Sequence, residues 1–111
     1  MVQPSEQSWV LESCTLPSAD QPLRSAEFDE LFASGVTAVE RSPAGVRLTL
    51  TPDAGVAGRA ADLAAREAQC CSFFTFILTA TGGGLSLDIT APPNHGYVLD
   101  AIAVRARAAG R

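Results

Sequence analysis

Two short segments alternate strictly between apolar and polar residues, and this alternation constrains the fold more than any other feature. Apolar side chains occupy every second position in residues 46–51 and again in residues 85–91. Successive side chains of a strand point to opposite faces, so each segment is expected to bury one face and expose the other. One-sided strands of this kind are typical of an antiparallel sheet covered by helices on one face.

The segments between these strands carry helical signals. Helical spacing of apolar residues, with Gly35 where a C-terminal cap should stand, predicts a first helix that ends there. A second helix is predicted from Pro52 to Cys71, and a third helix is predicted to begin at Asn94, which can cap it. Three further strands are predicted at residues 9–16, 36–41 and 73–81.

The predicted order of elements is β-α-β-β-α-β-β-α, in a single α+β domain that spans residues 1–111. Its first six elements match the ferredoxin-like β-α-β-β-α-β sandwich, with an added C-terminal strand and helix. In that topology the first and fourth strands lie side by side and antiparallel. The end of residues 9–16 would therefore meet the start of residues 73–81.

From the composition we expect neither a membrane nor a nucleic acid to be a direct partner of this domain. The chain is 47% hydrophobic, which supports a packed core in one domain. No apolar run reaches the roughly 18–20 residues needed to cross a bilayer, and no signal peptide is evident, so we expect a cytoplasmic protein with no membrane partner. The net charge is -4 and the arginines are scattered, so nucleic acid is not an expected direct partner.

Three cysteines are the most distinctive chemical groups of the chain. Cys14 lies near the end of the first predicted strand, and Cys70 and Cys71 lie just before the fourth, so the ferredoxin-like topology would bring the three thiols together. An odd number of cysteines in a reducing compartment favours thiols over disulfides. Thiolate sulfur prefers soft ions, and three thiolates favour mercury(II) or arsenic(III). With His95 as a fourth ligand, zinc or cadmium becomes possible.

Glu67 lies one helical turn before the cysteine pair, on the apolar side of the second helix. A carboxylate in that position is costly unless it is paired, for example with Arg59 or with Arg66 of a second copy. Glu67 could otherwise accept a proton from a thiol as a metal binds. It could also protonate a leaving group, which would make the protein an enzyme.

Several motifs together resemble a known bacterial domain. The pattern Cys-x-Leu-Pro at residues 14–17 and the pattern Glu-x-x-Cys-Cys-x-Phe-Phe at residues 67–74 are similar to those of a small domain that occurs alone and also behind MerR-type DNA-binding heads. The resemblance spans nearly the whole chain. It implies handling of metals or thiol-reactive compounds, as in heavy-metal resistance.

Three functions therefore follow from the sequence, in order of preference. The first is a soft heavy-metal binding protein that sequesters, transfers or senses its metal through Cys14, Cys70 and Cys71. The second is a thiol-dependent enzyme that cleaves an organometal or performs redox chemistry, with Glu67 as its acid or base. The third is an interaction module with structural cysteines, for which a homodimer is possible.

Overall fold

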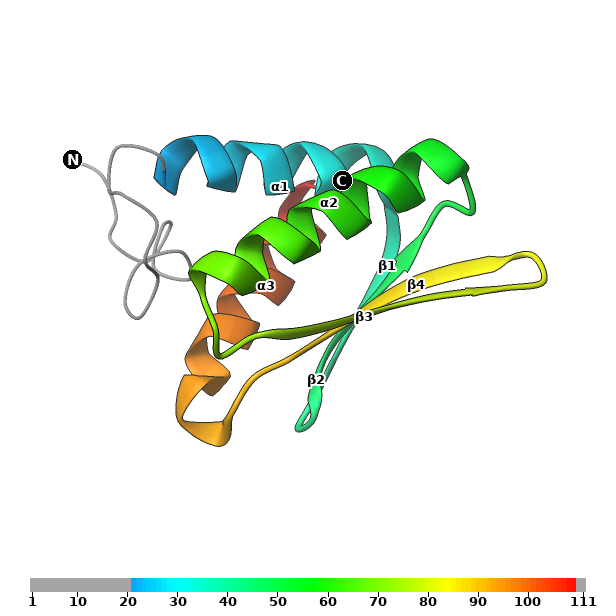
Figure 1. The fold of residues 1–111 in the computed structure, drawn as a ribbon. Coiled ribbons are helices and arrows are strands. Elements are labelled where there is room, and N and C mark those ends of the chain that lie inside the picture. Colours follow the sequence, from blue (N-terminus) through cyan, green and yellow to red (C-terminus); the bar gives the residue numbers. More distant parts are fainter. Residues whose placement is uncertain (1–20, 110–111) are drawn as a thin grey trace.

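The computed structural model describes residues 21–109. The strand predicted at residues 9–16, and Cys14 within it, lie outside the described residues. The elements that the structure describes are α1 (Gln21–Gly35), β1 (Val36–Ser42), β2 (Gly45–Leu50), α2 (Ala54–Cys70), β3 (Thr75–Thr81), β4 (Gly84–Thr90), the 3-10 helix η3 (Pro93–His95) and α3 (Gly96–Ala109) (Figure 1). Each helix and strand predicted within this range is present, although α2 begins at Ala54 and not at Pro52, and β3 begins at Thr75 and not at residue 73. The last helix begins at Gly96, because Asn94 belongs to the preceding 3-10 turn.

The four strands form one antiparallel sheet in the order β1-β2-β4-β3. The α+β class is confirmed, but the ferredoxin-like strand order is not. That order assigns the place between β2 and β3 to residues 9–16, whereas β4 occupies it. The reason is local: residues 82–83 join β3 directly to β4 as a tight hairpin, and Gly83 supplies the positive φ of 80° that this turn requires.

The core lies between the sheet and the helices, which cover one of its faces (Figure 1). The alternation predicted from the sequence is confirmed, because Leu48 and Leu87 are buried on the helical face while Arg47 is exposed on the other. The helix α2 packs on β3, α3 packs on β1 and β2, and α1 packs on both other helices. Within residues 21–109, the helices lack the length and apolar character that crossing a bilayer would require.

Helix α2 begins and ends at defined residues, and these fix where its side chains point. Asp53 is its N-cap in an extended conformation, and Asp53 Oδ2 accepts a hydrogen bond of 3.1 Å from the Val56 amide. The buried residues recur at helical spacing and form one stripe that faces the sheet. This stripe consists of Val56, Ala60, Leu63, Ala64 and Glu67.

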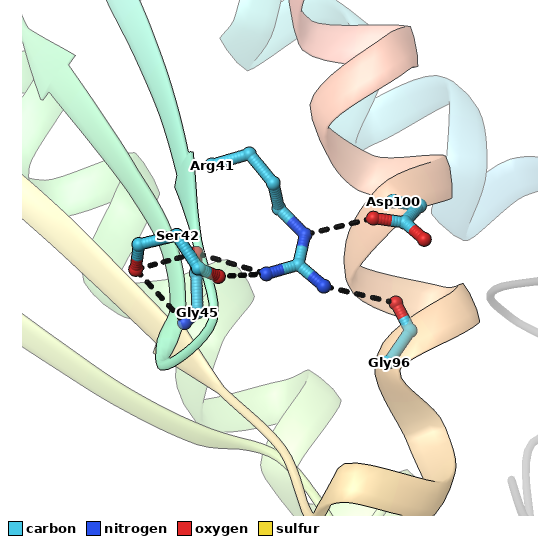
Figure 2. Close-up of polar contacts among 5 residues, drawn as sticks. All are labelled: Arg41, Ser42, Gly45, Gly96 and Asp100. Atoms are coloured by element: carbon cyan, nitrogen blue, oxygen red, sulfur yellow. Dashed lines mark hydrogen bonds and ion pairs between the residues drawn. The ribbon is translucent and has the colours of Figure 1, made fainter.

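The guanidinium group of Arg41 forms a clamp that joins the β1–β2 hairpin to the N-terminal part of α3 (Figure 2). Arg41 Nε donates to Asp100 Oδ1 at 2.9 Å, and Arg41 Nη2 donates to the Gly96 carbonyl at 3.4 Å. Arg41 Nη1 donates to the carbonyls of Ser42 and Gly45, the second at 3.5 Å. Because η3 leads directly into α3, this clamp also holds the segment that carries His95.

Candidate thiol and carboxylate site

Glu67, Cys70 and Cys71 lie together at the C-terminal end of α2. The Glu67 side chain is fully buried, with 0% of its surface exposed, and the same is true of Cys71. Cys70 is half-buried and packs at the margin of the core. Both cysteines are thiols. The sequence therefore predicted correctly that Glu67 would lie on the buried side of its helix.

The two neighbouring thiols have different surroundings because the helix ends between them. The Cys71 amide donates to the Glu67 carbonyl at 2.7 Å and so completes the last turn. Cys71 itself leaves helical geometry, with φ of -122° and ψ of 87°. Consecutive side chains cannot both enter one core in regular structure. Cys71 is the one that enters it, and Cys70 remains accessible at the surface.

An aromatic turn follows the cysteines and brings η3 close to them. The Phe74 amide donates to the Cys71 carbonyl at 3.2 Å. The ring of His95 stacks on Phe73, with centroids 4.1 Å apart and planes inclined by only 7°. His95 Nδ1 is buried and forms no hydrogen bond with the described residues. The structure therefore places His95 against a residue that lies two positions after Cys71.

The described residues alone do not form a metal centre. Within residues 21–109, no group of three or more His, Cys, Asp or Glu side chains is arranged to hold a metal ion. The predicted three-thiolate site needs Cys14, which lies outside this range. Its assembly stays a prediction, as does the participation of His95 as a fourth ligand.

The two arginines that the sequence suggested as partners of Glu67 form ion pairs elsewhere. Arg66 donates to both carboxylate oxygens of Glu27, at 3.1 and 3.0 Å, and to Asp62 at 2.8 Å. These hydrogen bonds, foremost the two that Arg66 donates to Glu27, raise the pKa of Arg66 above its usual value. Arg59 donates to Ser34 Oγ at 3.0 Å and lies 3.9 Å from Glu30. Both arginines thus tie α2 to α1 at the surface.

Sequence reasoning missed the aromatic surroundings of His95. The ring of Phe73 stacks on His95, and the centroid of the exposed Tyr97 ring lies 6.2 Å from that of His95. A weak signal was present, since an aromatic residue follows Cys71 and also His95 by two positions. The contact between the two motifs depends on tertiary structure and could not be read from either alone.

Fold and site together define a mixed α+β domain whose described part has a four-stranded antiparallel sheet on one side and helices on the other. Adjacent thiols and a buried carboxylate mark the end of one of these helices. No known protein family, curated protein or solved structure matches this chain. The similarity to a domain appended to MerR-type regulators stays a prediction.

Proposed function

We propose that this protein binds one soft metal ion, of the mercury(II) or arsenic(III) type, through the thiolates of Cys14, Cys70 and Cys71. The observation that carries this proposal is the pair of adjacent thiols placed one helical turn after a fully buried carboxylate. Thiolate sulfur selects soft ions over magnesium or calcium, which prefer oxygen ligands. A reducing cytoplasm, which we propose as the location, would keep these thiols available.

The difference in exposure between the two thiols suggests an order of binding. Half-buried Cys70 can meet an incoming ion first, and buried Cys71 then replaces a water or a carrier ligand. Thiols must lose their protons to become ligands, so binding releases protons. Glu67 is the nearest carboxylate along α2 and is a suitable acceptor for one of them. His95, held by its stack on Phe73, is the candidate fourth ligand if the ion is zinc or cadmium.

The complete burial of Glu67 favours one second candidate, an enzyme that cleaves an organometal. In that reaction the thiolates bind the metal, and the protonated Glu67 carboxyl delivers its proton to the carbon. The carbon–metal bond breaks, the hydrocarbon leaves, and the metal remains on sulfur. Binding remains the preferred function, because it needs only the thiols.

The experiment that tests the proposal is native mass spectrometry of the reduced protein with mercury(II), arsenite, cadmium(II), zinc(II) and phenylmercury. We expect one ion per chain, lost on Cys70→Ser or Cys14→Ser substitution and retained in the matched control Ser72→Ala. Glu67→Gln should retain mercury(II) while abolishing release of benzene from phenylmercury if the enzyme hypothesis holds. A triple cysteine-to-alanine variant that binds these ions as the native chain does would refute both functions.

A further inference from the structure

The strand β3 forms one end of the described sheet and carries no charged residue along its whole length. Its sequence is Thr-Phe-Ile-Leu-Thr-Ala-Thr, in which β-branched and aromatic residues predominate. Ile77 is 54% exposed and Leu78 is 36% exposed, which makes them two of the largest exposed apolar side chains of the described residues. An uncharged edge strand of this composition offers its backbone groups to another strand.

The opposite edge of the sheet, β1, is different in each of these respects. It carries Glu40 and Arg41, and its register shifts between Val36 and Ala38. Charged side chains and irregular register are the devices by which natural edge strands avoid pairing with other chains. Only one of the two edges of the described sheet is therefore protected.

A shallow apolar groove accompanies β3 on the helical side of the sheet. Its volume is about 290 Å³, and small alanine side chains of α2 leave the space open. The residues that line it are Ala61, Ala64, Ala65, Ala68, Phe76, Leu78 and Leu87. The unprotected edge and the apolar groove together form a continuous surface that can receive both a strand and its side chains.

We propose that β3 pairs antiparallel with β3 of a second copy of this chain, so that two four-stranded sheets become one. A two-fold axis perpendicular to the sheet keeps both helical layers on the same side. Residues that oppose each other across such a pair share a face, so the axis lies between the two strands at the level of one residue, which then opposes its own copy. Leu78 is the central residue of β3 and is the proposed position of the axis.

The self-complementarity of β3 is what favours a second copy as the occupant. With the axis at Leu78, Phe76 lies opposite Ala80 of the other copy, which pairs a large side chain with a small one. Thr75 lies opposite Thr81, and Ile77 opposite Thr79. No like charges meet, because β3 carries no charged side chain. Leu78 of the second copy can fill the groove beside the alanines of α2.

This inference does not depend on metal binding, and its test is the oligomeric state of the intact, reduced chain. Sedimentation velocity at several concentrations should show a dimer. Leu78→Lys and Leu78→Glu should each weaken the dimer by roughly tenfold or more, because each places two like charges opposite each other at the axis. A mixture of the two variants should restore association as a heterodimer. Thr79→Lys lies on the exposed face and does not alter the groove. It should still weaken association, because it places a charged side chain opposite Ile77 of the other copy.

Matched controls make the outcome decisive. Ala38→Lys adds a charge to the exposed face of the opposite edge and should leave the dimer unchanged. Circular dichroism of each variant checks that it folds. A monomeric native chain would overturn the proposal, and so would a dimer that tolerates both Leu78 substitutions. A native monomer that dimerises only after removal of residues 1–16 would assign the edge to that segment and would equally overturn it.

Discussion

Replacement of Gly45 by alanine should destabilise the protein, because the added methyl group does not fit between two strands. Gly45 is buried at the start of β2, where this strand approaches β4. A Cβ added there would lie well inside the van der Waals distance of the Ile89 carbonyl oxygen and 3.0 Å from Thr90 Cγ2. The first obstacle is a backbone atom, which cannot rotate away. The two strands must therefore move apart at this point.

The magnitude follows from comparison with a glycine that has space around it. Overpacking of this kind costs about 1–3 kcal/mol of unfolding free energy. Gly58 lies within α2, and a Cβ there would meet nothing within 4 Å. Gly58→Ala should stabilise the protein by about 0.5–1 kcal/mol, since alanine is the better helix former. The two glycine-to-alanine substitutions should therefore shift stability in opposite directions.

Urea unfolding followed by circular dichroism measures both variants on the same scale. In thermal unfolding each kcal/mol corresponds to roughly 4–8 °C for a domain of this size. The reasoning would be refuted if Gly45→Ala were as stable as the native chain. A loss of stability in Gly58→Ala would contradict the description of its surroundings in the same way.

Three further results are expected. Asp53→Ala should lower the unfolding free energy by about 1 kcal/mol through loss of the α2 cap, and Asp53→Asn, which caps equally well, should lower it far less in the same urea titration. Arg41→Ala should lower the unfolding free energy by about 1–2 kcal/mol, mostly because its hydrogen bonds to backbone carbonyls are lost. Asp100→Asn should lower it by less than about 1 kcal/mol, because the Asp100 side chain is 68% exposed. Equal decreases in the two variants would contradict this division. Cys70 should react with iodoacetamide well before Cys71, as followed by peptide mass spectrometry, and equal rates would show that the two thiols do not differ in access.

Much of the local structure could be predicted from the sequence, because periodicity reports which face of an element is buried. The alternation around Leu48 and Leu87 identified both central strands and their buried faces. The stripe on α2 correctly predicted that Glu67 would be buried. The strand order could not be obtained in the same way, because alternation does not say which strands are neighbours. The hairpin at Gly83 decided that question in favour of β4 beside β3.

The site was predictable only as far as it lies on one continuous segment. The adjacency of Cys70 and Cys71 to Glu67 follows from helical spacing, and their unequal burial accompanies the end of the helix between them. The stack of His95 on Phe73 joins two segments that are separated by a hairpin, so no local pattern contains it. Cys14 was assigned to the site through the ferredoxin-like topology, which the strand order does not confirm. The inclusion of Cys14 among the metal ligands therefore rests on the proposed metal chemistry.

The contrast between the two edges of the sheet also sets a limit on how far association can proceed. If both edges were smooth and uncharged, one molecule could join a neighbour on each side, and the contact could repeat without end as in a fibril. Here one edge carries Glu40 and Arg41 and is irregular near Val36. When the uncharged edges of two molecules pair with each other, only their protected β1 edges remain at the two ends of the joined sheet. Growth would therefore stop at a closed pair.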